Sequence, residues 1–297
     1  MRQKTELGCV LAACRRGAWH IKKDLPCQDA YAIETKIVAD KTCLALAVAD
    51  GHGHHRHDLS QYGANIAVKL AIESASTFFN DFYSQPENLN RSQLKANFRY
   101  NFPRCLGRSW REAVLEDAAN RLSIDSPNDE QINKLLKRYG TTLLVALILP
   151  DLLLLGQIGD GDILRIFPDG SVVQPFQPNP LLIGNSTYSL SSLNADKLWQ
   201  TATLERQPGE AVLLSTDGLS NAFITEEQFY IFAQSLLARI KEFDINTIDM
   251  LLPRWLDEYS KRASGDDITL VIFHDNMEKG ELRKEITENS NVHNEEY

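Results

Sequence analysis

Cysteine is scarce in this sequence, and no Cys-x-x-Cys pair occurs. The five cysteines among 297 residues are an odd number, which favours reduced thiols in a cytoplasmic protein over a disulfide framework. The N-terminus lacks the apolar core of a secretory signal peptide. No long apolar run occurs either, because Pro150 and Asp151 interrupt the most apolar segment, 142–158. That segment predicts two buried strands joined by a tight turn, since a membrane helix needs about 20 continuous apolar residues.

Positive charge is in deficit, with a formal net charge of −9 at pH 7. This argues against nucleic acid or a membrane as the main partner. A site that concentrates cations would explain the excess of acid, and so would ordinary acidic surface charge. Internal repeats and a dividing linker are also lacking. We therefore expect one domain over residues 1–274, with a helical insert over about 59–138, and then a polar, mobile tail over 275–297.

The most informative stretch is the apolar run 44–49, which is followed directly by Asp50, Gly51, His52 and Gly53. The run predicts a buried strand that ends abruptly. A carboxylate at such an end is held rigidly and still reaches solvent, and Gly51 leaves its carbonyl uncovered. Hard divalent cations prefer carboxylate, carbonyl and water oxygens. An Asp-Gly pair is also common in plain turns, so this stretch alone leaves both interpretations open.

The same arrangement recurs at three other apolar runs. Acidic residues with glycine follow two of these runs and precede the third, at Asp160, Asp162, Asp217, Asp266 and Asp267. Clustered carboxylates repel one another unless cations lie between them. We therefore predict a site for Mg²⁺ or Mn²⁺, with ligands from Asp50, the Gly51 carbonyl, Asp217 and Asp266. Two such ions close together activate water, and a phosphate ester is the natural substrate.

Hydrophobic periodicity predicts antiparallel strands mixed with helices. Strands are expected over 6–13, 27–33, 38–50, 143–149, 152–158, 163–167, 171–173, 201–206, 211–215 and 268–273. Helices are expected over 59–82, 106–122, 130–138, 225–240 and 246–261. Segments 15–26, 85–101 and 174–200 are expected to be loops or irregular, and 35–42 is expected to connect the second and third strands.

A cluster of histidines follows the first acidic turn, at His54, His55 and His57. Such a cluster is compatible with zinc binding. However, the spacing does not suit one helix face, and no cysteine lies close in the sequence. We therefore expect loop histidines that face water.

The order of the polar motifs carries a resemblance. The motifs are Gln28-Asp29, Asp50-Gly-His-Gly53, Gly140-Thr-Thr142, Gly159-Asp160, Asp217-Gly218 and Asp266-Asp-Ile-Thr269. As an ordered set they are specific, and the sequence resembles the PP2C-type (PPM) metal-dependent serine/threonine protein phosphatase family from about residue 6 to 274. Segment 20–30 is similar to a bacterial branch of that family. The resemblance implies an α+β fold in which two antiparallel sheets pack face to face with helices outside each, a four-layer α/β/β/α sandwich.

The resemblance also implies roles for the acidic residues. Asp50 would bridge two Mg²⁺ or Mn²⁺ ions, and the Gly51 carbonyl would bind one of them. Asp217 and Asp266 would hold the other ion, while Asp29 would orient metal-bound water without binding metal itself.

Three further positions follow from the resemblance. Asp160 matches a residue that helps to bind a third, weaker ion in related phosphatases, with Asp267 as a candidate second ligand. His52 would be the acid that protonates the leaving oxygen, a role worth about 10²–10⁴-fold in rate. Beside Asp160, the family's usual Ser-Arg is replaced by Gly161 and Asp162.

Two departures concern metal affinity and phosphate binding. Gln28 stands where many relatives have glutamate, which puts the affinity of the neighbouring metal in doubt. The phosphate-binding arginine of eukaryotic relatives would align near Asp24, which cannot serve. The basic segment 15–26 is a solvated loop in one interpretation. In the other it supplies the phosphate contact, from His20 first, then Lys22 or Lys23.

The leading hypothesis is a cytoplasmic phosphoprotein phosphatase that hydrolyses phosphoserine and phosphothreonine by direct attack of a dimetal-bound water. The expected partner is a phosphorylated protein, supplied by a serine/threonine kinase, and the expected state is a monomer. One alternative is a metal-binding signalling module with weak or no turnover, which Gln28 keeps open. Another is a phosphomonoesterase for small metabolites.

Overall fold

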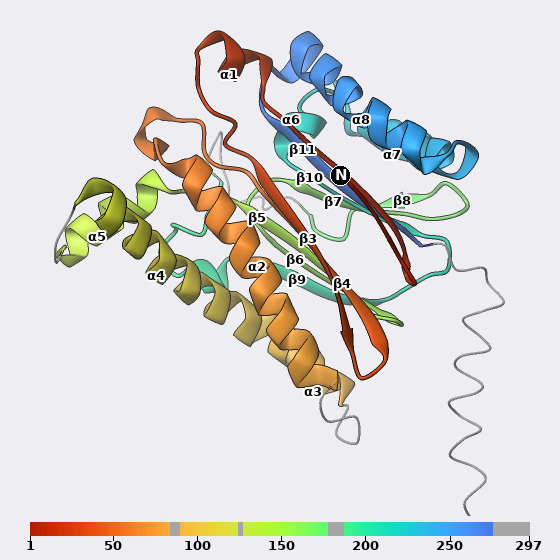
Figure 1. Cartoon of the computed structure of the whole chain (residues 1–297), viewed down its shortest axis with the longest axis horizontal. Coiled ribbons are helices and arrows are strands. Elements are labelled where there is room, and N and C mark those ends of the chain that lie inside the picture. Colours follow the sequence, from red (N-terminus) through yellow and green to blue (C-terminus); the bar gives the residue numbers. More distant parts are fainter. Residues whose placement is uncertain (84–89, 124–126, 178–186, 276–297) are drawn as a thin grey trace, which may run out of the picture.

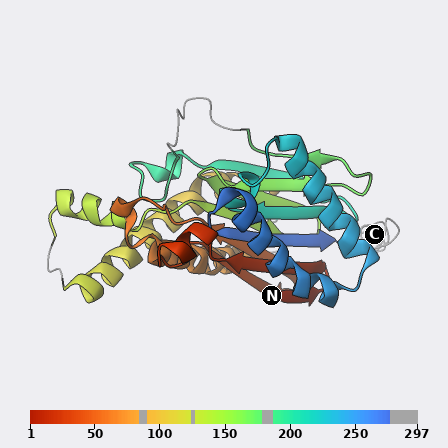
Figure 2. The same ribbon diagram turned by 90° about the horizontal axis from the view of Figure 1, so that it is seen from above.

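Two antiparallel sheets pack face to face, and helices cover the outer face of each (Figure 1; Figure 2). The computed structural model describes residues 1–83, 90–123, 127–177 and 187–275. This is the four-layer α/β/β/α arrangement that the sequence predicted, so the expected fold class is confirmed. Strands from both halves of the chain contribute to each sheet.

The first sheet has six strands in the order β1-β2-β11-β10-β7-β8. Their bounds are β1 Arg2–Thr5, β2 Gly8–Arg15, β7 Asp162–Ile166, β8 Val172–Val173, β10 Ala211–Ser215 and β11 Ile268–Asp275. The second sheet has five strands in the order β3-β4-β5-β6-β9. Their bounds are β3 Ala30–Val38, β4 Lys41–Ala49, β5 Leu143–Ile148, β6 Leu152–Ile158 and β9 Gln200–Glu205.

The helices divide between the two outer faces. The five-stranded sheet is covered by α2 Ser60–Tyr83, α4 Phe102–Leu122 and α5 Asp129–Arg138, with α3 Arg91–Ala96 and a π-helical turn Asn97–Asn101 before α4. The six-stranded sheet is covered by α7 Glu226–Glu242 and α8 Ile245–Tyr259, and α8 continues into a π-helical turn Ser260–Ser264. Short helices are α1 Ala18–Lys22, α6 Asp217–Ser220 and the 3₁₀ turns His55–His57 and Ala195–Lys197. None of the described helices is both long and apolar enough to span a membrane.

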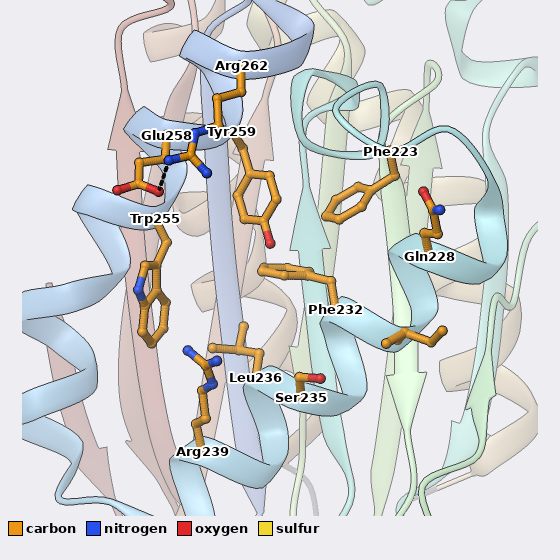
Figure 3. A pocket seen from close by; sticks show the side chains of 11 residues that line it. Phe223, Gln228, Phe232, Ser235, Leu236, Arg239, Trp255, Glu258, Tyr259 and Arg262 are labelled. Atoms are coloured by element: carbon orange, nitrogen blue, oxygen red, sulfur yellow. Dashed lines mark ion pairs between the residues drawn. The ribbon is translucent and has the colours of Figure 1, made fainter.

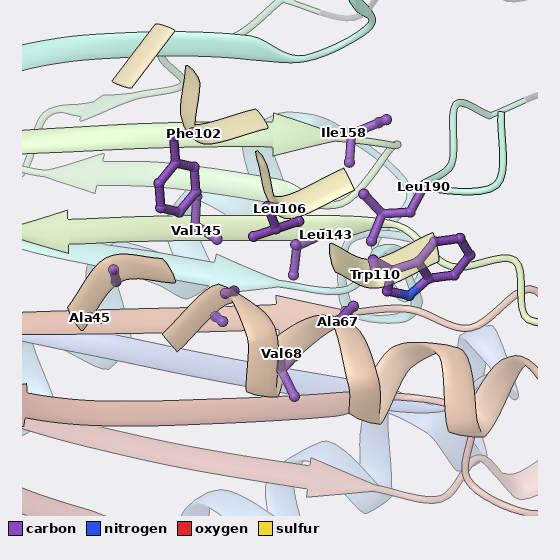
Figure 4. Packing of buried hydrophobic residues seen from close by; sticks show 14 of the residues in the cluster. Ala45, Ala67, Val68, Phe102, Leu106, Trp110, Leu143, Val145, Ile158 and Leu190 are labelled. Carbon is purple, nitrogen blue, oxygen red and sulfur yellow. The ribbon is translucent and has the colours of Figure 1, made fainter. Parts of the chain in front are cut away.

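Side-chain size alternates along β4 and explains how the layers pack. Leu44, Leu46 and Val48 point into the core between the two sheets. The alternate positions are small residues that face the helices, namely Cys43, Ala45, Ala47 and Ala49. They meet a matching row of alanines on α2, including Ala67, which lies over this sheet in Figure 4. Because successive side chains of a strand point to opposite faces, one apolar run serves both cores and brings Asp50 to their common end.

The second strand begins later than the sequence indicated. It was predicted over 27–33, but β3 covers Ala30–Val38, so Gln28 and Asp29 lie before the strand. The predicted connection over 35–42 is also wrong, because β3 and β4 pair as far as Val38 and Lys41. Ala39 and Asp40 form the two-residue turn, both with positive φ, as in the tight hairpins that follow strand twist.

Two segments predicted to be irregular are partly helical. Within 85–101, residues 91–101 form α3 and the π-helical turn, and Phe98 and Phe102 are buried against Phe78. Pro103 lies in the first turn of α4, where a missing N–H costs nothing, so it begins the helix rather than blocking it. Within 15–26, residues 18–22 form α1. The segment 2–5, for which no strand was predicted, is the edge strand β1.

The predicted tail begins one residue too early. Asp275 is the last residue of β11 and is 1% exposed, where its carboxylate pairs with Arg206 at 2.6 Å. Arg206 also donates to the carbonyls of Leu149 and Pro150. This buried pair ties the end of β11 to the other sheet. Residues 276–297, the rest of the predicted tail, lie outside the described residues, as does the middle of the predicted loop 174–200.

Candidate functional site

Asp50 stands directly after β4, and its main chain is fixed by the neighbouring residues 140–142. The Asp50 carbonyl accepts hydrogen bonds from Thr142 N and Thr141 Oγ1, both at 2.8 Å. Thr142 Oγ1 in turn accepts from Asp50 N at 3.0 Å. The Gly-Thr-Thr motif therefore sets the backbone from which the Asp50 carboxylate projects.

Gly51 makes a close turn that no other residue could make. Its N–H donates to the Gln28 carbonyl at 3.1 Å. A Cβ at this position would lie 2.7 Å from that carbonyl oxygen and 2.9 Å from the Ser60 carbonyl oxygen, which is too close for a real contact. The Gln28 side chain lies beside the turn: its Nε2 donates to Ser60 Oγ at 2.7 Å, and its Oε1 is buried without a partner among the described residues.

Asp29 is buried at the junction of the two sheets. Its Oδ2 accepts a hydrogen bond from Thr216 Oγ1 at 2.8 Å, and Thr269 N donates to the same hydroxyl at 2.9 Å. Thr216 lies between β10 and α6, and Thr269 lies in β11. The three residues therefore connect the start of β3 to the six-stranded sheet at the end where the acidic turns lie.

Asp217 and Asp266 occupy two adjoining turns. Asp217 is the first residue of α6, and its Oδ2 accepts from Asn221 Nδ2 at 3.0 Å. Asp266 precedes β11, and its Oδ1 accepts from Asp267 N at 2.9 Å. The two turns touch at Gly218, where a Cβ would lie 2.0 Å from the Asp267 carbonyl oxygen and 3.3 Å from Asp266 Cβ.

The charges of four strand-end aspartates act on one another. Burial raises the pKa of Asp50 well above its usual value, and the charges of Asp29, Asp217 and Asp266 raise it further. Burial and the charge of Asp160 raise the pKa of Asp217 to about 6. The pKa values of Asp29 and Asp266 are also raised, in both cases mainly by burial. Asp29 is buried, Asp50 and Asp217 are half-buried and Asp266 is exposed, and carboxylates whose charges act on one another in this way repel unless a positive charge lies between them.

The oxygen atoms of these residues are of the kind that binds a hard divalent cation, although the side chains do not converge closely enough to coordinate one. Among the described residues, no three histidine, cysteine, aspartate or glutamate side chains converge closely enough to hold a metal ion. The groups that gather are carboxylate and carbonyl oxygens, which Mg²⁺ and Mn²⁺ prefer. The orphaned Gln28 Oε1 beside the Gly51 turn offers an acceptor for water on such an ion.

Asp267 makes structural contacts, and its expected part in a third metal site stays a prediction. One carboxylate oxygen accepts from Gly17 N and the other from Gln28 N, each at 2.6 Å. The imidazole of His20 also lies against it, with Nδ1 2.9 Å from Oδ2. Asp267 therefore holds the start of α1 and the residues before β3 close to the start of β11.

The predicted phosphate-binding residues divide into two groups. His20 is buried beside the acidic turns: Nδ1 contacts Asp267, and Nε2 lies 3.6 Å from Asp266 Oδ1. The hydrogen bond to Asp267 raises the pKa of His20. Lys22 and Lys23 are exposed, and their ammonium groups lie 5.7 Å and 4.9 Å from the centre of the Trp19 ring. The structure brings His20 to the site and gives both lysines a different contact.

His52 lies two residues after Asp50 in the sequence, and its side chain is half-buried. Its backbone N–H donates to the Gly140 carbonyl at 3.1 Å, and its ring meets His57 edge-on at 4.9 Å. Burial and the nearby His57 lower the pKa of His52 to about 4. His54 and His55 are exposed, as predicted, and His57 contacts the Lys137 carbonyl.

Asp160 and Asp162 lie in the second acidic turn along the chain. Burial raises the pKa of Asp160, whose charge in turn reaches Asp217. Burial raises the pKa of Asp162 to about 7, and the charges of Asp217 and Asp160 add to this effect. Asp162 pairs in register with Ser215, two residues before Asp217. The sequence assigned no role to Asp162, although its position at the start of a strand beside Asp160 was the available signal.

A hollow of about 520 Å³ between α7 and α8 lies apart from these residues. Figure 3 shows Phe223, Phe232 and Tyr259 facing one another across it, with ring centroids 5.0–5.5 Å apart. None of the predicted site residues lines this hollow. The acidic site is therefore formed by strand ends and not by this groove between helices.

Comparisons with known proteins agree with this arrangement. The family model for protein phosphatase 2C matches residues 16–257. The S. agalactiae serine/threonine phosphatase has a TM-score of 0.57 and 14% identity, and the match covers 93% of this chain and 100% of that chain. A bacterial serine phosphatase has a TM-score of 0.56 and 15% identity, with 91% and 98% covered. The Mycobacterium tuberculosis serine/threonine phosphatase PstP has a TM-score of 0.51 and 18% identity, with 90% and 98% covered.

Identities this low establish a shared fold only, and no curated protein matches the sequence significantly. The family match is independent of those structures and covers most of the chain. The observed sandwich of two antiparallel sheets agrees with it. The chain therefore belongs to the protein phosphatase 2C family of serine/threonine phosphatases.

Proposed function

We propose that this chain removes phosphate from phosphoserine and phosphothreonine in proteins by direct attack of water, with two Mg²⁺ or Mn²⁺ ions bound at the acidic strand ends. The observation that carries the proposal is that Asp29, Asp217 and Asp266 all raise the pKa of Asp50. These four residues come from segments far apart in the sequence, and a partly buried cluster of carboxylates is costly without cations.

The residues that would hold the ions are Asp50, the Gly51 carbonyl, Asp217 and Asp266, with Asp160 near a third and weaker position. When bound, such ions lower the pKa of water and neutralise charge on the phosphoryl group. Asp29 holds its orientation through Thr216 and would accept a proton from the attacking water. Gln28 Oε1, buried and without a described partner, would accept from a second water.

His20 is proposed as the contact to the substrate phosphate. Its Nδ1 is fixed by Asp267, while Nε2 faces Asp266. We expect His20→Ala to raise KM by about tenfold and to lower kcat by less, because a charged hydrogen bond to the phosphate contributes about 1.5 kcal/mol to binding. Steady-state kinetics on a phosphopeptide measure both constants.

Lys23→Ala is the matched control, since Lys23 belongs to the same segment but lies against Trp19. It should leave both constants close to those of the wild type. A larger loss of kcat than of affinity in His20→Ala would show instead that His20 positions Asp266 during the chemical step.

Substrate class separates the proposal from its competitors. We expect Mn²⁺-dependent release of phosphate from phosphoserine and phosphothreonine peptides at rates well above those for free phosphoserine or sugar phosphates. A preference for the small substrates would establish a metabolite phosphatase. Metal binding without release of phosphate from any of them would establish a binding module. The phosphorylated protein itself would be produced by a serine/threonine kinase.

A further inference from the structure

A basic groove lies between α4, α5 and the segment 190–196. Its volume is about 470 Å³. The basic residues that line it are Arg104, Arg108, Arg111 and Lys137. The three arginines follow the spacing i, i+4, i+7, so they share one face of α4, and Lys137 comes from the last turn of α5.

These four cations are exposed and make no ion pair with any residue that the structure describes. Further along the same helix, Arg121 is held by Asp117 at 3.0 Å. Asp196 is the acidic residue that lines the groove. Like charges at i, i+4 disfavour a helix slightly. A cluster of this kind, in a chain whose net charge is −9, makes a local positive field that is suited to an acidic ligand.

The walls of the groove are partly apolar and leave room for a chain. Gly107 lies in the middle of α4, where a glycine costs about 1 kcal/mol relative to alanine, and a Cβ there would meet nothing within 4 Å. Leu136 and Leu190 are buried on the walls, and Leu193 stands 85% exposed at the rim. Apolar contacts beside separated charges suit a peptide better than an inorganic anion.

The groove is joined directly to the site around Asp50. Leu190 N donates to the Thr141 carbonyl at 3.0 Å, and Thr141 Oγ1 donates to the Asp50 carbonyl. On the other wall, the Lys137 carbonyl accepts from Gly140 N at 3.1 Å. Lys137 therefore lines the groove, and the segment 137–142 that it begins also fixes Asp50. These hydrogen bonds link the groove to the residues that hold Asp50.

We propose that this groove binds an acidic segment of the phosphoprotein substrate, so that the enzyme favours phosphorylated residues with aspartate or glutamate nearby in the sequence. The inference rests on the proposed function, because it names the class of substrate for the same site. Nucleic acid is disfavoured as the ligand, since the net charge of −9 repels a polyanion that would extend beyond the groove.

Two phosphoserine peptides of equal length test this, one with acidic flanks and one with glutamine and asparagine in their place. In the wild type, kcat/KM should be at least about fivefold higher for the acidic peptide, as expected for a few exposed charge pairs. Arg104→Gln/Arg108→Gln should abolish that ratio and leave turnover of p-nitrophenyl phosphate unchanged. The preference should also weaken with added salt.

The matched control is Arg254→Gln/Lys261→Gln, which removes two exposed cations near α8, on the other outer face. It should keep the wild-type preference. Equal rates for the two peptides in the wild type, or a preference that survives in the groove variant, would overturn the inference. So would stronger competition from a single-stranded oligonucleotide than from an unphosphorylated acidic peptide.

The experiments distinguish an error in the proposed peptide binding by the groove from an error in the proposed phosphatase activity. Fluorescence anisotropy with a labelled, unphosphorylated acidic peptide measures binding to the groove without turnover. An enzyme that binds this peptide through Arg104 and Arg108 but hydrolyses neither phosphopeptide would refute the phosphatase assignment alone. An enzyme that hydrolyses both phosphopeptides equally and does not bind the acidic peptide would refute the groove alone.

Discussion

Asp50→Asn and Asp217→Asn should each reduce Mn²⁺-dependent hydrolysis of p-nitrophenyl phosphate by about 10³-fold or more. Asparagine keeps the size of the side chain but removes the charge that would hold the ions. Without the ions, the transition state would lose several kcal/mol of charge stabilisation. Each 1.36 kcal/mol added to the activation free energy lowers the rate tenfold. Initial rates over a range of Mn²⁺ concentrations measure the effect and show whether excess metal restores activity.

Thermal unfolding with and without Mn²⁺ separates loss of metal from loss of fold. Without metal, Asp50→Asn should be at least as stable as the wild type, because it removes one of several neighbouring carboxylates that repel one another. With Mn²⁺ at about 100 times Kd, the wild type should gain about 2.7 kcal/mol, and the variant should gain much less. Asp81→Asn, which removes an exposed carboxylate on α2, is the charge-matched control. Wild-type activity in either site variant would contradict the ligand assignment.

The acidic strand ends could be predicted from the sequence because their signal is local. A strand that is buried on both faces has an unbroken apolar sequence. Asp50 follows such a strand directly, and Asp217 follows one after a single residue. Gly51 could be predicted as well, since a turn that brings a carbonyl close to its neighbours excludes a Cβ. That these ends meet at one edge of the sandwich required the family resemblance, because β4 and β10 lie in different sheets.

The roles of Asp266 and Asp267 could not be separated in the sequence. They are neighbours with the same side chain, yet their surroundings differ. Asp266 lies beside His20 near the other carboxylates, while Asp267 accepts hydrogen bonds from the backbone of Gly17 and Gln28. Those donors are 250 and 239 residues away along the chain. Only the folded structure shows that Asp267 accepts backbone hydrogen bonds while the charge of Asp266 reaches Asp50.

The helix α1 could not be predicted from the sequence for a similar reason. A helix of five residues is too short to show hydrophobic periodicity, so 15–26 looked like a basic loop. The backbone of Gly17 binds Asp267, and Ala18 N binds Ser260 Oγ at 2.9 Å, so tertiary contacts determine where the helix begins. The same contacts bury His20, whereas Lys22 and Lys23 turn outward to Trp19.

The second large effect is expected at His52, and it should depend on the leaving group. An alkoxide from phosphoserine is a strong base and needs a proton as it departs, whereas p-nitrophenolate is a weak base and does not. His52 can supply that proton if the negative charge of the bound phosphate raises its pKa from about 4, and His52→Gln should then lower kcat for a phosphoserine peptide by about 10²–10⁴-fold. With p-nitrophenyl phosphate the loss should stay below about threefold, since no proton transfer is needed there.

His57→Gln is the control for this experiment, because the His57 ring lies 4.9 Å from the ring of His52 but His57 lies outside the acidic turn 50–53. His57→Gln should change kcat little with either the phosphoserine peptide or p-nitrophenyl phosphate. Equal losses with the two substrates in His52→Gln would mean that the residue positions Asp50 or the substrate and transfers no proton. The stabilisation by Mn²⁺ should be the same in His52→Gln as in the wild type, because the backbone bond from His52 to Gly140 does not depend on the side chain. A leaving-group effect with unchanged metal binding would therefore place His52 in the chemical step itself.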